Sequence, residues 1–426
     1  MYGIVSWFRK SIPLLFLLPV AVYSQTVTLD SVQVLARKNY PAIRQKDLLK
    51  KTASLNVSNL NKNFLPQFSV NGQASYQSDV TNIDVTLPGG LTFDSPSKDQ
   101  YKLTADVNQL IYDGGVTKQQ KAIAEMNAVV EDQQIEVELY KVREKVNDIF
   151  LSILYTDELI KQTELVEKDL QTGLKKVDAQ VQNGVAFRSS SNILKADLLK
   201  TGQRRIELQA SRKALIETLA LFTAQKMNEQ SVFEKPAVTS DLSNDISRPE
   251  IRLYDNQVSL LAQQNKLIDS RNLPRTSLFF QGGYGKPALN LLKNEFEPFY
   301  VTGVKLSWAL NGFYTRKNDR QLVKINQDIV DAKRETFLLN TNAALATQRN
   351  EIDKLIKLIE SDNEIIQLRK SVTDAAKAQL ENGVMTANDY LVEVNAEDQS
   401  RQVLIGHELQ LLQAQIVYNT IKGPRQ

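Results

Sequence analysis

The sequence contains no cysteine and only one histidine, His407, in 426 residues. Without cysteine we expect no disulfide, no thiolate metal site and no lipid attached to an N-terminal cysteine. A lone histidine on a predicted helix is much more often a surface or packing residue than a metal ligand. The carboxylates are spread along predicted helices as solvated faces. We therefore predict no catalytic residue, no metal site, no cofactor and no enzymatic activity.

The chain also lacks a surplus of charge of either sign and lacks any long apolar run. Lys and Arg number 52 against 49 Asp and Glu, which gives no basic surface of the kind that binds nucleic acid. Arg9 and Lys10 precede a short apolar stretch, residues 12–22, that two prolines interrupt. This pattern predicts an export signal over residues 1–24 and not a membrane helix. Later in the sequence no stretch approaches the roughly 18 apolar residues that a membrane-spanning helix needs.

Proline is missing from two long stretches, residues 113–183 and 311–382. A helix of about 70 residues would be about 105 Å long, too long for a compact domain. Apolar residues recur in both stretches in one seven-residue phase: Ile135, Leu139, Val142, Val146, Ile149 and Ile153 in the first, and Ile352, Leu355, Ile359 and Ile366 in the second. So narrow an apolar seam is typical of a coiled coil.

Before each long stretch the sequence period changes from that of a helix to that of a strand. Residues 68–76 alternate apolar or small residues with polar ones, and residues 101–111 do the same. The pattern returns later, with apolar positions at Leu278, Phe280, Gly282 and Tyr284 and then at Val304, Leu306, Trp308 and Leu310. An unbroken polar face beside an apolar one fits a transmembrane barrel strand of about ten residues, although a half-buried soluble strand could look similar.

These elements occur twice in the same order. Pro41 and Pro66 have the same separation as Pro249 and Pro274, and residues 179–185 match residues 378–384 at a spacing of 199. Before the second copy, Ser247 and Glu250 predict a capping box with proline in the first helical turn. The chain is therefore predicted to be an internal duplication.

Each copy supplies two barrel-like strands, so one chain supplies four. An open sheet cannot remain in lipid because its edges would leave backbone groups unpaired. The chain must therefore oligomerise, as a dimer with eight strands or a trimer with twelve. Barrels of eight strands are filled by their own side chains, whereas larger barrels leave a lumen.

The strand-to-helix junctions at residues 112–115 and 308–312 and the paired Asn-Gly tips resemble the TolC-type outer-membrane efflux family. The similarity extends over essentially the whole mature chain. It implies a fold that is mainly α with a small β part, in which duplicated coiled-coil hairpins and four transmembrane strands per chain assemble into a trimer. That trimer would form a twelve-stranded β-barrel in the outer membrane and an α-helical tunnel in the periplasm. The implied partners are outer-membrane lipid, a periplasmic adaptor protein and an inner-membrane pump of the RND or ABC class.

The resemblance and the sequence pattern together divide the chain into eight segments. These are a signal peptide (1–24), periplasmic helices (25–64), barrel strands one and two with an extracellular loop (65–112), the first long hairpin (113–222), an equatorial connector (223–247), the helix of the second repeat (248–273), barrel strands three and four with their loop (274–311) and the second long hairpin (312–422).

Two kinds of surface follow as candidate sites. Tight helix reversal explains the glycine of each tip but not the apolar residue after it. We therefore expect contact with the adaptor at Asn183, Gly184, Val185, Asn382, Gly383 and Val384. The lipid-facing positions of the strands are predicted to be Phe68, Val70, Tyr76, Leu306 and Trp308. Packing at the strand–helix junction is an equal alternative for Trp308.

The resemblance also implies a periplasmic gate near the second tip, where acidic rings narrow the tunnel in this family. Asp389 matches the first acidic position, whereas Val392 stands where a second would fall and Glu393 is one residue out of place. The first repeat has Ser190 at the position of Asp389. The function implied is the exit duct of a tripartite efflux or type I secretion system. The alternative is a secreted or periplasmic coiled-coil scaffold or adhesin without channel activity.

Overall fold

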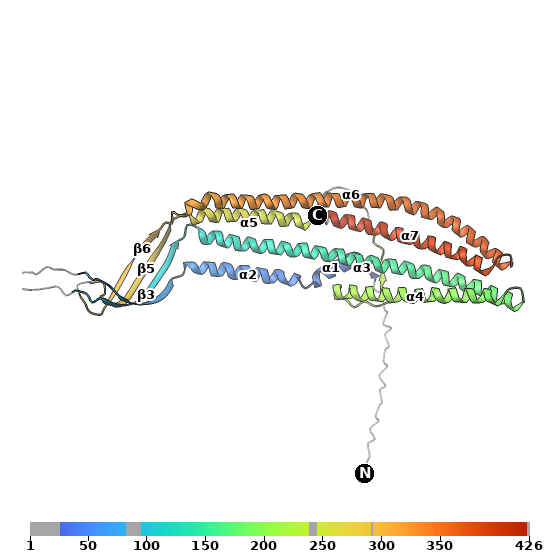
Figure 1. The fold of residues 1–426 in the computed structure, drawn as a ribbon, viewed down its shortest axis with the longest axis horizontal. Helices are drawn as coiled ribbons and strands as arrows, with labels where there is room; N and C mark the ends of the chain where they lie inside the picture. The colour runs from blue at the N-terminus through green and yellow to red at the C-terminus, as the bar shows by residue number, and fades with distance from the viewer. Residues whose placement is uncertain (1–25, 82–94, 238–244, 291–292, 424–426) are drawn as a thin grey trace, which may run out of the picture.

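The computed structural model describes residues 26–81, 95–237, 245–290 and 293–423. The molecule is elongated, with a β-sheet at one end and two helical tips at the other, and the last described residue, Gly423, lies near mid-length (Figure 1). The predicted signal peptide lies outside the described residues, as do parts of both predicted extracellular loops and of the connector. No described helix is both long enough and apolar enough to cross a membrane.

The first repeat consists of one long helix with shorter helices aligned along it. Helices α1 (Leu29–Asn39) and α2 (Ile43–Asn61) precede the sheet, α3 (Val116–Gln182) runs from the sheet to the tip, and α4 (Arg188–Thr223) returns from it. In Figure 1, α2 and α4 follow one another along α3. All six predicted seam residues of α3, from Ile135 to Ile153, are buried, which confirms the coiled-coil seam.

The second repeat has the same plan. Helix α5 (Pro249–Arg271) leads to the sheet, α6 (Gly312–Glu381) runs to the tip and α7 (Ala387–Lys422) returns beside it. Helix α3 packs against both α5 and α7, so the two repeats form one bundle. The broadest apolar core lies near mid-length, where α1, α3, α4 and α7 meet a small parallel pair, β1 (Thr26–Val27) and β4 (Val232–Phe233).

The main sheet takes two strands from each repeat. A 3-10 turn, η1 (Lys62–Phe64), precedes β2 (Gln67–Tyr76), which is followed by β3 (Asp99–Tyr112), β5 (Arg275–Lys286) and β6 (Glu297–Ser307). The order is β2-β3-β5-β6 and every neighbouring pair is antiparallel.

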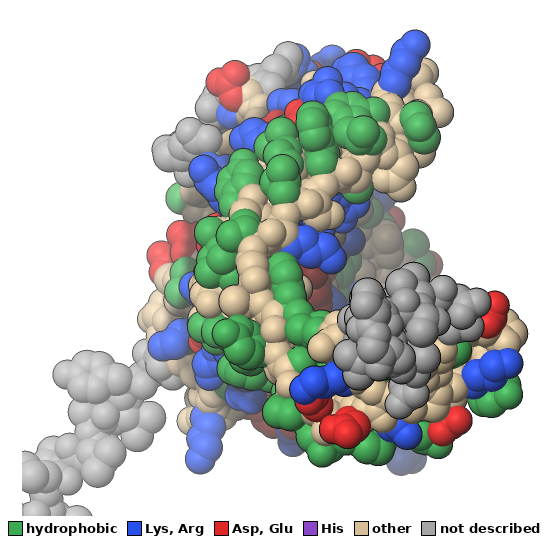
Figure 2. Space-filling model, turned by 90° about the vertical axis from the view of Figure 1, so that its left-hand side faces the viewer, with side chains coloured by type: hydrophobic (Ala, Val, Ile, Leu, Met, Phe, Trp, Pro, Cys, Tyr) green, Lys and Arg blue, Asp and Glu red, His purple; other side chains and the backbone are tan. Residues whose placement is uncertain are grey.

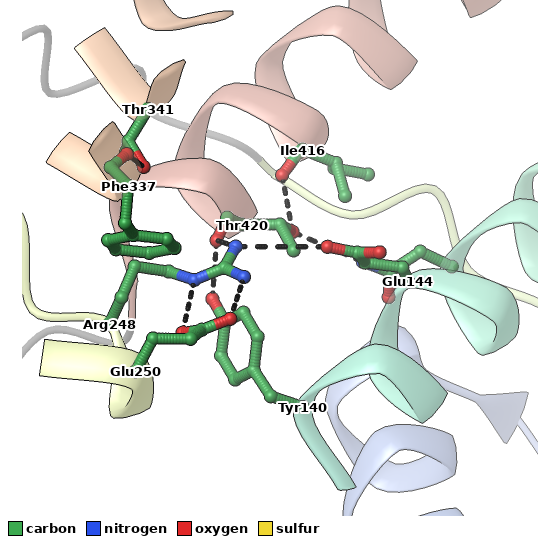
Figure 3. Close-up of polar contacts among 9 residues, drawn as sticks. Tyr140, Glu144, Arg248, Glu250, Phe337, Thr341, Ile416 and Thr420 are labelled. Carbon is green, nitrogen blue, oxygen red and sulfur yellow. Dashed lines mark hydrogen bonds and ion pairs between the residues drawn. The ribbon is translucent and has the colours of Figure 1, made fainter. Parts of the chain in front are cut away.

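A buried ion pair between Arg248 and Glu250, at the start of α5, contacts helices of both repeats (Figure 3). Arg248 donates to both carboxylate oxygens of Glu250 at 3.0 and 2.5 Å, and its guanidinium also donates to the Thr420 carbonyl of α7 at 3.3 Å. The guanidinium carbon lies 4.6 Å from the ring centre of Tyr140 on α3, a cation–π distance. The hydroxyl of Tyr140 donates to the same Thr420 carbonyl at 2.5 Å.

The predicted capping box at the start of α5 is wrong. The N-cap residue is Arg248, without a side-chain cap, and not Ser247. Glu250 is unavailable to complete a box because its carboxylate is held by Arg248. The predicted box has given way to a pair two residues apart, whose arginine also contacts Tyr140 of α3 and Thr420 of α7.

Candidate functional site

The end of the molecule that carries the sheet exposes a continuous apolar face. The register places Phe68 opposite Val107, Val107 opposite Phe280 and Phe280 opposite Thr302, so alternate residues of all four strands share one face. Large side chains on this face are exposed: Phe68, Val70, Tyr76, Tyr101, Leu103, Leu278, Phe280, Tyr284, Tyr300, Val304 and Leu306. Figure 2 shows hydrophobic side chains gathered in a band at this end. So large an apolar surface on a single chain indicates that something covers it.

The opposite face of the sheet is mostly polar. It carries Gln67, Ser69, Asn71 and Gln73 from β2 and Lys102, Thr104, Asp106 and Asn108 from β3. Asp106 accepts hydrogen bonds from Asn71 at 2.7 Å, Thr104 at 3.0 Å and Gln281 at 2.5 Å, which links three strands. A polar inner face and an apolar outer face are the arrangement of a barrel strand in lipid.

Trp308 lies one residue beyond the end of β6, contrary to the prediction that it belongs to the strand. Its indole N–H donates to the backbone carbonyl of Asn272 at 3.0 Å, and its ring meets Phe313 edge-on. The residue therefore ties the end of the strand to α5 and α6. About half of its side chain remains exposed.

The two outer strands of the sheet, β2 and β6, each have a neighbour on one side only within the described residues. Both are long, with 10 and 11 residues. Long unprotected edges pair readily with another chain. Because the four strands alternate in direction, β6 of one copy can pair antiparallel with β2 of the next.

At the far end of the molecule both tips adopt the same turn. In each, the N–H of the glycine donates to the carbonyl three residues earlier at 3.1 Å, and the N–H of the following valine donates to the carbonyl five residues earlier at 2.8 or 2.9 Å. Gly184 and Gly383 have φ of 73° and 72°, a left-handed conformation that favours glycine. These are two Schellman motifs, with Asn183 and Asn382 as the C-cap residues of α3 and α6.

The valines of the tips point into solvent. Val185 is 70% exposed and Val384 is 78% exposed, so neither packs against its own helix as a Schellman motif often allows. The turn therefore explains the glycines but not the valines.

The two tips are held side by side. Gln180 of α3 donates to the carbonyls of Leu380 and Glu381 at the end of α6, at 3.0 and 3.3 Å. Lys176 forms an ion pair with Glu381. Below the tips, Tyr390 is buried against Gly173, and burial raises the pKa of Tyr390 to about 12. The phenol is therefore neutral at any physiological pH.

Asp389 lies in the first turn of α7 and is exposed on this chain. Its backbone N–H donates to the hydroxyl of Thr386 at 3.2 Å, and its carboxylate accepts from that hydroxyl at 2.7 Å. This interaction was not predicted from the sequence, although threonine three residues before an acidic residue is a known capping signal. Glu393 lies one turn further on and is paired with Arg369 at 3.7 Å.

Within the described ranges no cluster of three or more His, Cys, Asp or Glu residues is placed to hold a metal ion. The single histidine, His407 on α7, contacts Asp362 of α6, with 2.5 Å between Nδ1 and Oδ2. This pair links the two helices of the second hairpin.

An exposed apolar sheet attached to a long periodic helical bundle fits the class of outer-membrane channel proteins. Residues 32–225 match the family model of the outer membrane efflux protein. This match confirms the resemblance to the TolC-type family seen in the sequence. It is a protein of the bacterial outer membrane with a large periplasmic extension, and family and fold support a role as an efflux channel.

Solved outer-membrane channels share this fold over nearly the whole chain. The outer membrane protein VceC of Vibrio cholerae is 13% identical, with a TM-score of 0.64 over 92% of this chain and 95% of that one. The CmeC outer membrane channel of Campylobacter jejuni is 14% identical, with a TM-score of 0.62 over 93% and 85%. The MtrE outer membrane channel of Neisseria gonorrhoeae is 15% identical, with a TM-score of 0.62 over 93% and 89%. Comparison with curated proteins gives no match.

Proposed function

We propose that three copies of this chain form the exit duct of a tripartite efflux or type I secretion system. Their twelve strands would close a barrel in the outer membrane, and their helices would continue it as a tunnel into the periplasm. The observation that carries the proposal is the sheet itself, which is apolar on one face, mostly polar on the other and, among the described residues, unpaired at the outer edges of β2 and β6. Closure of the sheet would satisfy both edges and cover the apolar face with lipid.

The experiment is a native mass measurement of the detergent-solubilised protein, followed by reconstitution in a planar bilayer. The expected result is a trimer that conducts ions. A stable monomer or dimer would reject the architecture, and a trimer that never conducts would reject the duct. The scaffold alternative would extract from membranes in carbonate, whereas a barrel requires detergent.

The tips support a second part of the proposal, that the tunnel end docks on a periplasmic adaptor coupled to an inner-membrane pump of the RND or ABC class. Both tips lie furthest from the sheet (Figure 1) and expose a valine that the turn does not require. An exposed apolar side chain at the same position of both repeats is suited to a protein interface.

Replacing both Val185 and Val384 with Asp should abolish efflux and adaptor recovery in a pull-down, because a carboxylate would be desolvated at the contact. The trimer mass should not change, since both side chains are exposed in the free chain. Alanine at the same two positions provides the milder control. If efflux and adaptor recovery are unchanged in the Asp variant, the tips only reverse the chain direction and do not contact the adaptor.

We propose in addition that Asp389 contributes one acidic ring where the helices converge. Three carboxylates in a narrow wet entrance would attract cations and repel one another. The proposal is supported by the position of Asp389 close to the second tip and by its exposure on the single chain.

A further inference from the structure

The two tips have the same backbone but different side chains at the residue that starts the returning helix. Thr386 precedes α7, and its hydroxyl caps that helix. The equivalent residue of the first repeat, 199 positions earlier, is Phe187, which precedes α4 with no side-chain cap. Phenylalanine cannot accept a hydrogen bond, so α4 forgoes the stabilisation that a threonine gives α7.

Phe187 does not make up for the missing cap by packing. Its side chain is 82% exposed, although an aromatic ring of this size is normally covered. The neighbouring apolar residue of the same tip, Val185, is exposed as well. The missing cap and the exposed ring bring no stability within the chain. Residues that break such local rules are expected at functional sites.

The charges beside the two tips also differ. Arg188 follows Phe187 and is exposed, and no acidic side chain of the described chain forms an ion pair with it. At the second tip the equivalent stretch is Ala387, Asn388 and Asp389, which carries a carboxylate. Beside the exposed valine that both tips share, the first tip is therefore aromatic and positive, whereas the second is polar and negative.

We propose that Phe187 and Arg188 form the stronger of the two docking points on the adaptor. The inference rests on the proposed function and adds the chemistry of the partner. The site on the adaptor that receives them is a pocket with apolar walls and an Asp or Glu at its rim. Aromatic residues and arginine are the side chains that most often dominate the free energy of binding at an interface. The second tip makes a weaker contact with the same partner, through Val384 and polar side chains.

The experiment places a photo-reactive benzoylphenylalanine at residue 187, 386 or 221 of the full chain in cells, and adducts are identified by mass spectrometry. Leu221 is 84% exposed on the same helix, about 50 Å from Phe187 at about 1.5 Å per residue, and serves as the control. The expected result is an adaptor adduct that is strongest at 187 and absent at 221. The adaptor peptide captured at 187 should contain Asp or Glu beside apolar residues.

Substitutions then test the two side chains. Phe187→Ser should reduce adaptor recovery by about tenfold or more and raise the thermal stability of the trimer, because serine restores the cap. Arg188→Glu should weaken binding similarly, and exchanging the captured Asp or Glu for Arg should restore it. A merely structural role for Phe187 would give the opposite stability change.

The outcomes separate this inference from the docking proposal. Adducts to the adaptor at 386 that equal or exceed those at 187 would leave docking intact and overturn the asymmetry. No adaptor adduct at either position would reject docking itself. An adduct with lipid at 187 would also overturn the inference, because the partner would then be a membrane.

Discussion

Asp389 has one role in the single chain and a second, proposed role in the trimer. In the chain its backbone N–H and its carboxylate bond to the hydroxyl of Thr386. In the proposed trimer it would line the entrance. The resemblance to a family identifies the acidic position, and the motif of threonine followed by an acidic residue identifies the cap. The resemblance does not predict the cap and the motif does not predict the ring, because the cap depends on one turn of backbone and the ring depends on three chains.

Two substitutions distinguish the ring from the cap. Asp389→Asn keeps an acceptor for Thr386 but removes the charge, whereas Asp389→Ala removes both. If the ring exists, both variants should lose cation selectivity and block by multivalent cations from the periplasmic side in single-channel recordings. Ala should also destabilise the protein by about 0.5–1.5 kcal/mol, because it removes the hydrogen bond from the Thr386 hydroxyl while the cap on the Asp389 N–H stays. Unchanged selectivity in both variants would exclude the ring and leave Glu393 as the next residue to test.

At the scale of an element, sequence periodicity predicts more than it does at the scale of a residue. A period of seven in α3 and α6 and a period of two in the strands are repeated many times, so single exceptions do not obscure them. The ends of elements are set by one or two interactions. Trp308 follows the strand pattern, but β6 ends before it and its indole bonds instead to Asn272. The start of α5 was mispredicted because Glu250 has a better partner in Arg248 than in a cap.

The two faces of β2 offer a test within one element. Val70→Arg should impair assembly, because arginine on a lipid-facing strand position costs about 2–4 kcal/mol near the middle of the membrane. Ser69→Arg, next to it but on the polar face, should be tolerated, and Leu306→Arg should repeat the effect of Val70→Arg on β6. The measurement is the amount of heat-resistant oligomer in outer-membrane fractions. Equal tolerance of both faces would remove the case for lipid.

At the scale of the whole molecule, the duplication and the helix lengths could be predicted from the sequence. The joint between the repeats, which is the set of contacts among Tyr140, Arg248 and Thr420, could not. Tyr140, Arg248 and Thr420 are far apart in the chain and share no motif, and only the packing of α3 on α5 and α7 brings them together. The pairing of the tips through Gln180 is likewise a tertiary contact that no periodic pattern encodes.

Breaking this joint should affect the entire bundle. The side chains of Arg248 and Glu250 are only 12% and 11% exposed, so Arg248→Met would leave a buried carboxylate without its partner. We expect a loss of about 3–5 kcal/mol, seen as a lower unfolding temperature of the solubilised protein. The double variant Arg248→Met with Glu250→Gln should recover much of that loss, since the uncompensated charge is gone. A single variant as stable as the original would show that the pair is not needed.

The position of this joint has a mechanical consequence. Helix α6 has 70 residues and is therefore about 105 Å long, so a tilt of 1° at the sheet would displace its tip by about 2 Å. A displacement of that size exceeds what a hydrogen bond such as that of Gln180 tolerates. The strands alone are too distant to fix the positions of the tips. The contacts around Arg248, near mid-length, halve the length of helix over which a tilt is amplified. Stiffness at the centre of the rods then sets how accurately their ends meet another protein.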